Sequence, residues 1–408
     1  MKIPLSLISL LLYVSRMTID DALITTQDKL DKAISYLSQS DVIAIDTEFM
    51  RDKTYFSKLC LIQIAGGGRY FAIDPIDTNL DFTSFYQLLQ DENIVKVFHA
   101  ARQDIEIFHI LTGKVPTPLF DSQIAAMVCG LGDQIGYDKL VQHYLGIQID
   151  KSSRFTDWSK RPLSGKQLRY ALDDVIHLEK IYPLLKAELE ANKRASWIEA
   201  DMAVLRDANT YIIDERDVYK RIKIRSPKPK VLNRLRELAA FREIECRKRD
   251  LPRGRFLKDE TLIDLAASGP QSYNELSKIR GLQVSENSWL TTKLLKLIKD
   301  ADASDKDSWP IIEKKGPIEK PPAAILEMLR VLLKHVCDEL GVASRVIATA
   351  AELEKLALSD DADQPILQGW RYEVFGKKAL EMKKGQVAIT LQGNQICFHP
   401  ISTLPVKE

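Results

Sequence analysis

The feature that most constrains the fold is a run of four apolar residues, Val42 to Ile45, that ends at an acidic residue, Asp46. A run without polar alternation is typical of a strand buried on both faces, in the middle of a sheet covered by helices. We predict further strands at residues 59–65, 70–73 and 94–98, with helical segments between and after them. The sequence therefore predicts an α/β domain built around one central strand.

Two local signals support this architecture. Gly66, Gly67 and Gly68 separate two of the predicted strands, and glycines suit the tight turn of a hairpin. Ser164 and Gln167 form a capping-box pattern, which an apolar helical stripe follows. We therefore predict a hairpin at the glycines and an amphipathic helix that begins after Ser164.

The rest of the chain is mainly helical and is divided by two breaks. Residues 226–230 are rich in Lys and Pro, and residues 300–322 are rich in Asp, Lys and Pro. The 408 residues suffice for two or three domains. We predict an N-terminal extension at 1–18, an α/β domain at 19–210, a basic linker at 211–230, a helical domain at 231–300, a linker at 301–322 and a second helical domain at 323–408.

The N-terminal extension contains an apolar run at residues 5–14 that is too short to span a bilayer. No small-x-small cleavage site follows it, and we interpret Met17 as the natural start; an export signal and a docked terminal segment are the alternatives. The five cysteines are far apart and show no metal-binding spacing, which indicates reduced thiols. We expect a cytoplasmic protein without a membrane role.

Charge is distributed unevenly along the chain. The formal net charge is only +1, yet residues 215–258 hold 16 Lys and Arg against 6 Asp and Glu. Everything else therefore carries about −9, by subtraction from the same total. A basic middle joined to an acidic remainder suggests a polyanion-binding surface beside a carboxylate-rich site.

Four acidic residues on different predicted elements are candidates for that site. Asp46 and Glu48 are two apart on a strand, so their side chains project to the same side. Asp104 lies where a strand turns into a helix, and Asp174 shares a helix face with Tyr170, four residues earlier. Each alone is more simply a solvated or helix-stabilising acid, but together they could converge on one point.

Convergence of four carboxylates in a poorly solvated site is costly unless cations neutralise it. Hard oxygen ligands suit Mg²⁺ or Mn²⁺, and two such ions can hold the attacking and leaving oxygens of a phosphoryl displacement. Tyr170 would then orient the attacking water. No GxGxxG pattern follows the first strand, which argues against a dinucleotide cofactor.

These residues resemble the three motifs of the DEDDy group of 3′→5′ exonucleases: Asp46-Thr47-Glu48, Asp104 in FHAARQDIEIF, and Tyr170-x-x-x-Asp174 in YALDDVIHL. Longer stretches, such as IDTEFMRDKTYFSKLCLIQIA and KSSRFTDWSKRPLSGKQLRYALDDV, are similar to the bacterial ribonuclease D family. The resemblance covers residues 19–204. It implies a ribonuclease H-like domain with a mixed five-stranded sheet, three strands antiparallel and two parallel, with flanking helices.

By the same resemblance, Asp46, Glu48, Asp104 and Asp174 are metal ligands and Tyr170 is the catalytic tyrosine. The Tyr-x-x-x-Asp spacing selects Asp174 over its neighbour Asp173. We expect Asp121 to have a local structural role rather than to bind metal directly. His99 and Phe49, with Met50 beside it, are candidate substrate contacts, and core packing is the alternative for each.

The segment FREIECRKRDLPRGRFLKDETLIDLA resembles the HRDC module, a helical domain shared by certain helicases and ribonuclease D. Residues 323–398, which include GWRYEVFG, resemble a second and more divergent copy. Together they imply two all-α HRDC-type domains after the exonuclease domain. Candidate phosphate contacts in the basic segment are Lys228, Arg234, Arg253 and Arg255.

The resemblance implies a 3′→5′ exoribonuclease that trims structured RNA, such as tRNA precursors, and releases nucleoside 5′-monophosphates by two-metal hydrolysis. A DNA-directed exonuclease is the alternative within the same class, and the sequence discriminates poorly against it. A non-catalytic RNA-binding scaffold is disfavoured, because every matched catalytic position carries the required residue.

Overall fold

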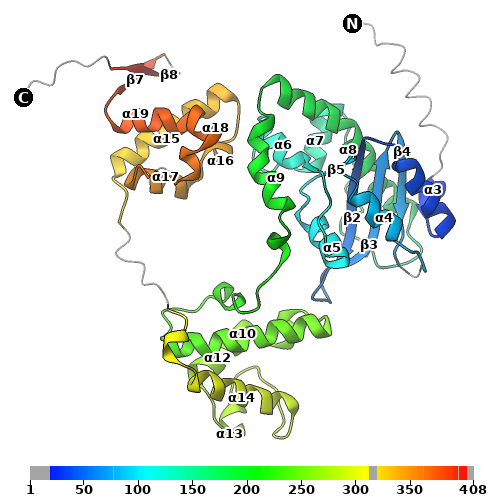
Figure 1. Ribbon diagram of the computed structural model, residues 1–408, viewed down its shortest axis with the longest axis vertical. Coiled ribbons are helices and arrows are strands. Elements are labelled where there is room, and N and C mark those ends of the chain that lie inside the picture. The colour runs from blue at the N-terminus through cyan, green and yellow to red at the C-terminus, as the bar shows by residue number, and fades with distance from the viewer. Residues whose placement is uncertain (1–18, 77, 312–318, 362, 394, 402–408) are drawn as a thin grey trace, which may run out of the picture.

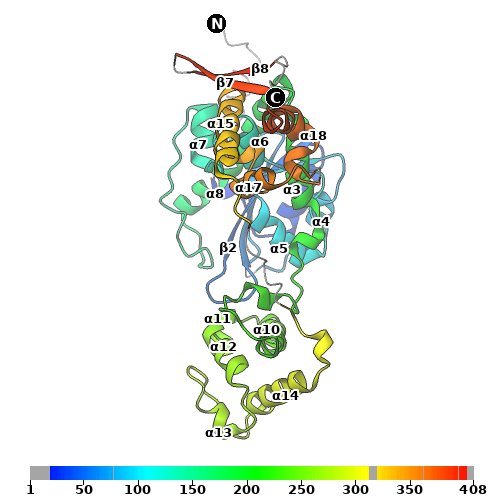
Figure 2. The ribbon, with the colours of Figure 1, turned by 90° about the vertical axis from the view of Figure 1, so that its left-hand side faces the viewer.

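The computed structural model describes residues 19–76, 78–311, 319–361, 363–393 and 395–401. These form an α/β domain, a helical bundle below it, and a second helical unit beside it, as Figures 1 and 2 show. The predicted N-terminal extension and the interpretation of Met17 lie outside the described residues. Within the described residues, no helix is long and apolar enough to cross a membrane.

The α/β domain is built on a mixed sheet with the strand order β1-β4-β3-β2-β5-β6. β3 runs antiparallel to both of its neighbours, β2 and β4. β5 and β6 continue parallel to β2, and β1 pairs parallel with β4. The expected five strands are present, and a two-residue strand adds a sixth at the edge. The strands are β1 (Leu23–Ile24), β2 (Val42–Met50), β3 (Lys58–Gly66), β4 (Arg69–Ile73), β5 (Val95–Phe98) and β6 (Leu119–Asp121).

The predicted hairpin is confirmed between β3 and β4. Gly67 and Gly68 form the two-residue turn with φ angles of +60° and +80°, which only glycine adopts without strain. Gly66 pairs with Arg69 across the hairpin, so the two strands begin pairing directly at the turn.

Helices cover both faces of the sheet, and β2 supplies alternate residues to the two sides. Ile43 and Ile45 belong to a core beneath α3, α4 and α5, whereas Ala44 belongs to the core beneath α8. Asp46 and Glu48 follow the parity of Ala44 and therefore face α8. The helices of this domain are α2 (Ile19–Ala22), α3 (Gln27–Leu37), α4 (Thr83–Leu89), α5 (Arg102–Thr112), α6 (Ser122–Val128), α7 (Tyr137–Leu145), α8 (Gly165–Ala191) and α9 (Glu199–Arg206).

The first helical unit is a small bundle with its own apolar core, in which Leu235 and Leu238 of α10 pack against Leu262, Leu265 and later residues. Three short 3-10 turns come before this bundle in the chain: η2 (Ala195–Ile198), η3 (Ala208–Tyr211) and η4 (Val218–Arg221). Its helices are α10 (Pro229–Arg249), α11 (Arg253–Phe256), α12 (Asp259–Ser268), α13 (Tyr273–Leu276) and α14 (Trp289–Ala303), followed by η5 (Lys306–Ser308).

The second helical unit shares a continuous apolar cluster with the α/β domain. Trp197 stacks on Trp370 with ring centroids 4.1 Å apart, and the Arg194 guanidinium donates to the carbonyls of Val128 and Leu340. The unit comprises α15 (Ala323–Leu340), α16 (Ser344–Ile347), α17 (Ala350–Leu358), η6 (Pro365–Leu367), α18 (Gly369–Arg371), η7 (Tyr372–Gly376) and α19 (Lys377–Lys383). A hairpin of β7 (Val387–Gln392) and β8 (Gln395–Pro400), absent from the all-α expectation, follows.

Candidate active site

Three of the four candidate carboxylates meet at the carboxyl-terminal part of β2. Asp46, Glu48 and Asp174 each present an oxygen within 4.8 Å of the other two. The two strand residues face α8 because they alternate with the buried Ile45 and Thr47. Asp174 comes from α8, which packs across β2, β3 and β4.

The fourth carboxylate, Asp104, lies in the first turn of α5 and is 7% exposed. Its Oδ1 accepts a hydrogen bond from the hydroxyl of Thr47. Thr47 sits between the two acidic residues of β2 and points to their opposite side. The charge of Asp46 helps to raise the pKa of Asp104, so the two groups are near neighbours even though Asp104 lies outside the cluster of three.

Burial and mutual repulsion set the protonation of this cluster. Burial and then the charge of Asp46 raise the pKa of Glu48 to about 10. Burial and then the charge of Asp173 raise the pKa of Asp174 to about 7, and the pKa values of Asp46 and Asp104 are raised as well, first by burial. The site therefore resists four negative charges without a cation.

The helix that carries Tyr170 and Asp174 begins as predicted. The Ser164 hydroxyl accepts from the Gln167 amide at 3.2 Å, and the Gln167 side chain accepts from the Ser164 amide at 3.0 Å. The Tyr170 hydroxyl hydrogen-bonds to Asp174 and lowers the pKa of that carboxyl against the effect of burial. The hydroxyl thus lies beside the carboxylates, where a water molecule would have to be oriented.

Asp121 holds the backbone next to the site. Its carboxylate accepts from the amides of Ala100 and Ala101 at 3.1 and 2.8 Å and caps α6 through the Gln123 amide. Ala100 has a φ of +58°, a strained conformation for a residue with a Cβ. Asp121 therefore stabilises the turn from which α5 carries Asp104, in keeping with the structural role expected for it.

His99 and Phe49 both line a cavity of about 440 Å³ that also contains Asp46, Glu48 and Asp174. The His99 Nδ1 lies 2.9 Å from the Ser122 hydroxyl and its Nε2 lies 3.1 Å from the carbonyl of Ile135. Both ring nitrogens therefore have protein partners. Phe49 directly follows a register shift in the pairing of β2 with β3. Such an irregularity changes the direction in which the side chains at the end of the strand point.

The cavity wall also contains residues that sequence reasoning missed, among them Tyr137, Lys151, Arg154 and Phe155. The Tyr137 hydroxyl donates to the backbone carbonyls of Asp173 and Asp174 and thereby ties α7 to α8. Lys151, Arg154 and Phe155 come from the segment before α8. The available signals were their nearness to the capped helix and their place in the stretch KSSRFTDWSKRPLSGKQLRYALDDV, whereas their distance from β2 is a tertiary property.

Arg253 and Arg255, the other two candidate substrate contacts, lie far along the chain, in α11. The Arg253 guanidinium binds both oxygens of Glu243 at 2.6 Å and the Tyr55 hydroxyl at 3.0 Å. The side chain of Glu243 is fully buried, and Tyr55 belongs to the loop between β2 and β3. Arg253 is therefore engaged in the interface between the two domains, whereas Arg255 is exposed and makes one long contact, 3.4 Å, to the carbonyl of Asp52.

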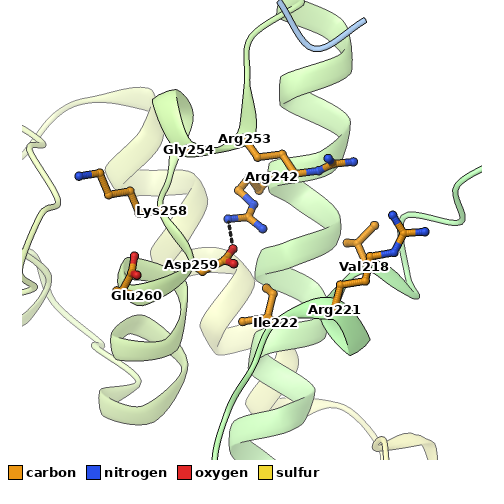
Figure 3. Close-up of a pocket in the computed structure, with 9 residues that line it drawn as sticks. All are labelled: Val218, Arg221, Ile222, Arg242, Arg253, Gly254, Lys258, Asp259 and Glu260. Atoms are coloured by element: carbon orange, nitrogen blue, oxygen red, sulfur yellow. Dashed lines mark hydrogen bonds and ion pairs between the residues drawn. The ribbon is translucent and has the colours of Figure 1, made fainter. Parts of the chain in front are cut away.

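Arg253 also lines a cavity of about 360 Å³ in the helical bundle, with Arg221, Arg242 and Lys258 (Figure 3). Arg242 donates to Asp259 at 2.7 Å in its centre. Arg234, a further candidate phosphate contact, is 8% exposed and forms a bidentate pair with Asp302. That pairing argues against a phosphate contact for Arg234.

The donor set fits hard divalent cations. The cluster offers carboxylate oxygens and no thiolate or imidazole, which suits Mg²⁺ or Mn²⁺. Burial first, and then mutual repulsion, raises the pKa values of Asp46 and Glu48, and a cation bound between the groups would offset both effects. Asp46, Glu48 and Asp174 could hold one ion, and Asp104 could complete a second position next to Asp46.

Comparison with known proteins gives two family matches. Residues 22–190 match the 3′-5′ exonuclease family, and residues 231–298 match the HRDC domain family. The chain is 43% identical to ribonuclease D of Bartonella henselae over 376 residues, which cover 92% of this chain and 93% of that one. It is 44% identical to ribonuclease D of Zymomonas mobilis, over 92% of this chain and 97% of that one.

The structural comparison agrees. The crystal structure of Escherichia coli RNase D, described as an exoribonuclease involved in structured RNA processing, matches with a TM-score of 0.73 and 28% identity. The match covers 89% of this chain and 98% of that one, so it includes the helical units as well as the α/β domain. The first helical unit corresponds to the HRDC match, and the assignment of the second as another HRDC domain stays a prediction.

Proposed function

The chain belongs to the ribonuclease D family of 3′→5′ exoribonucleases, and on that premise we propose that it trims the 3′ ends of structured RNA, such as tRNA precursors, with two divalent metal ions. The observation that carries the proposal is the meeting of Asp46, Glu48 and Asp174, from two separate elements, within 4.8 Å of one another. Such a concentration of ionised acid is costly unless protons or cations neutralise it, and bound cations do so at neutral pH.

In this proposal Asp46, Glu48, Asp104 and Asp174 hold the metal ions. The bound ions would supply a water molecule of lowered pKa and stabilise charge on the phosphate oxygens during in-line displacement. The protein orients the reactants. Tyr170 hydrogen-bonds to Asp174 and would orient the attacking water, while the Thr47 hydroxyl donates a hydrogen bond to Asp104.

The reaction adds water across the last phosphodiester bond. The water oxygen bonds to phosphorus, and the bond from phosphorus to the 3′ oxygen of the preceding nucleotide breaks. The departing nucleotide is a 5′-monophosphate, and the shortened RNA ends in a 3′ hydroxyl that takes up a proton. No covalent enzyme intermediate is needed, since none of the metal-binding groups has to attack phosphorus.

RNA with a folded body is the proposed substrate because the helical bundle adds basic surface beside the catalytic domain. Several of its cations are already paired, but Arg221, Lys223, Arg225 and Lys228 make no ion pair in the part of the chain that the structure describes. All four are exposed and close in sequence. An unpaired basic stretch is suited to phosphate contacts that do not depend on base sequence.

The test is hydrolysis of a tRNA with a 3′ extension, a matched unstructured RNA and a DNA strand of the same sequence, each with and without Mg²⁺ or Mn²⁺. The expected result is stepwise shortening from the 3′ end with release of 5′-monophosphates, only with metal, and preferentially on RNA. Equal rates on DNA would favour the DNA-directed alternative. A pure enzyme that binds RNA and hydrolyses none of the substrates would overturn the proposal.

A further inference from the structure

Two side chains at the edge of the catalytic cavity have no role in the hydrolysis described above. Arg154 and Phe155 line the same cavity as the carboxylates and belong to the segment that leads into α8. We propose that they form a nucleotide-binding subsite, in which Arg154 binds a backbone phosphate of the RNA and Phe155 stacks on a base. This inference rests on the proposed function.

Phe155 is 90% exposed. A single exposed apolar residue is unremarkable by itself, but this one borders a cavity rich in acidic oxygens. Its ring is flanked by the guanidinium of Arg154 at 5.2 Å from the ring centroid. An aromatic face beside a cation is the arrangement that proteins use to bind single-stranded nucleic acid, since every base offers a π-face and every linkage a phosphate.

Arg154 is the available cation of this cavity. Its wall contains one other Lys or Arg, Lys151, whose Nζ is 2.6 Å from Asp138 and is therefore already paired. The Arg154 guanidinium makes no ion pair and no hydrogen bond in the part of the chain that the structure describes. Its charge offsets part of the rise that burial causes in the pKa values of Glu48 and Asp174. When metal ions neutralise the acids, Arg154 remains free for a phosphate.

The segment that carries the pair is held in place from both ends. Ser153 and Trp158 are buried, and the Trp158 ring packs against Tyr170 with centroids 6.1 Å apart. The Thr156 hydroxyl accepts from the Gln167 side chain at 3.2 Å, which links the segment to the capping box of α8. Arg154 and Phe155 are thus presented at a defined position relative to Tyr170, so their contribution to binding is not lost to ordering the segment.

The stacking contact is tested with an RNA of ten nucleotides in which each of the last four bases is removed in turn. Phe155→Ala should raise KM on intact RNA about 5- to 100-fold with little change in kcat. For the wild-type enzyme, an RNA that lacks the stacked base should show the same rise in KM. For Phe155→Ala, removing that base should raise KM no further. Phe155→Tyr keeps the ring and should recover most of the KM effect of Phe155→Ala.

The phosphate contact is tested in the same way with single methylphosphonate linkages, which remove one negative charge. Arg154→Ala should lower kcat/KM about 10- to 100-fold, the range for losing a charge-assisted hydrogen bond. A methylphosphonate at one particular linkage should lower the kcat/KM of the wild type by a similar factor. The same substitution should leave the kcat/KM of Arg154→Ala unchanged. Arg154→Lys should recover part of the rate, because the charge is kept.

Lys160→Ala is the matched control, since Lys160 is an exposed cation of the same segment and does not line the cavity. It should change neither KM nor kcat. The subsite does not exist if Phe155→Ala keeps the wild-type KM and Arg154→Ala keeps the wild-type kcat/KM. It is also ruled out if the effects of these variants add to those of every abasic and methylphosphonate substitution. These results can be obtained only with a wild-type enzyme that hydrolyses RNA. If the proposed function is wrong, the wild type itself hydrolyses no RNA, so the two failures can be told apart.

Discussion

Asp46, Glu48 and Asp174 are held close together by the backbone against their own repulsion. The strand places the first two on one side, the helix adds the third, and burial denies all of them full solvation. Tyr170, Thr47 and Asp121 differ from them in contributing hydrogen bonds rather than the carboxylate oxygens proposed to bind metal. Substitutions at this scale therefore fall into two groups with different consequences for metal binding.

Removing one metal-ligand oxygen should abolish hydrolysis and leave the fold intact. We expect Asp104→Asn and Asp174→Asn to reduce hydrolysis of a short RNA to near the background rate. The metal-free variants should unfold at a temperature equal to or above that of the metal-free wild type, because each loses a repulsive charge. RNA hydrolysis and thermal unfolding in EDTA check both parts; full activity in either variant would remove that residue from the metal site.

Tyr170→Phe should separate positioning of water from binding of metal. The variant loses the hydroxyl and keeps the ring that packs near Trp158. Turnover should fall by about two to four orders of magnitude, a range typical of lost acid–base or positioning help. Calorimetric titration with Mn²⁺ should give wild-type affinity, and loss of metal binding would contradict the role assigned to the hydroxyl.

At the scale of elements, the site depends on how β2 and α8 are packed. β2 has its Ile residues in one core and Ala44 in the other, and it continues this alternation into the acidic residues. α8 spans 27 residues from its capping box and crosses three strands, so Asp174 is fixed relative to β2 by extensive packing. This rigidity has a measurable consequence, because the carboxylates cannot separate to relieve their repulsion.

The loss of stability with rising pH should weaken when metal is added. In the metal-free protein, the pKa of Asp174 is raised to about 7 and that of Glu48 to about 10. The folded state then holds more protons than the unfolded state, so the free energy of unfolding should fall as pH rises above about 4 through these values. Metal binding displaces the protons, so stabilisation by Mg²⁺ should increase over the same range.

Thermal unfolding at pH 6, 7, 8 and 9, with EDTA or with Mg²⁺, measures this dependence. Asp174→Asn provides the control, since it lacks one titrating group and should show a weaker trend in EDTA. A Mg²⁺-dependent shift of Tm that is the same at every pH would contradict linkage between protons and metal at this cluster.

On the scale of the whole molecule, both helical units are attached to the catalytic domain through specific contacts. The loop after β2 binds α10 through Tyr55, whose hydroxyl meets Glu243 and whose amide donates to Asp250 at 2.9 Å. The second unit shares an apolar cluster with the α/β domain, and the two lie beside each other in Figure 1. Deleting either unit would expose these surfaces, so charge substitutions in the full chain test RNA binding more cleanly than truncation.

Neutralising the unpaired basic stretch should weaken binding of structured RNA and reduce its dependence on salt. Each phosphate contact contributes roughly 0.7 to 0.9 to the slope of log affinity against log salt concentration. The variant replaces four residues with Ala: Arg221, Lys223, Arg225 and Lys228. We expect its slope on a hairpin RNA with a 3′ tail to be shallower by up to about 3, measured by fluorescence anisotropy.

A charge-matched control replaces four other exposed lysines that lack an ion pair in the described chain: Lys186, Lys355, Lys377 and Lys384. It should keep the wild-type slope. Hydrolysis of a short unstructured RNA should be nearly unchanged in both variants, because chemistry at a 3′ end needs only the catalytic cavity. Equal slopes for the wild type and both variants would make the basic stretch a solvated surface.

The sequence by itself determined the elements whose signals are local. The apolar run before Asp46, the glycines after β3 and the capping box at Ser164 depend on backbone preferences and short-range hydrogen bonds, and all three occur where expected. The motif spacing identified four of the five catalytic candidates, since residues two apart on a strand or four apart on a helix share a side in any fold. Asp104 was singled out by its position where a strand turns into a helix.

Only the tertiary structure determined which distant segments of the chain lie next to those residues. The short strands β1 and β6 are too brief to carry a pattern and exist because a neighbouring strand pairs with them. Some contacts join segments separated by up to 198 residues. They include the hydrogen bond from Thr47 to Asp104 and the contacts of Arg253 with Glu243 and Tyr55. The position of Arg154 and Phe155 at the cavity is a further example. Such contacts depend on how whole elements pack, and no local sequence pattern encodes the distance between them.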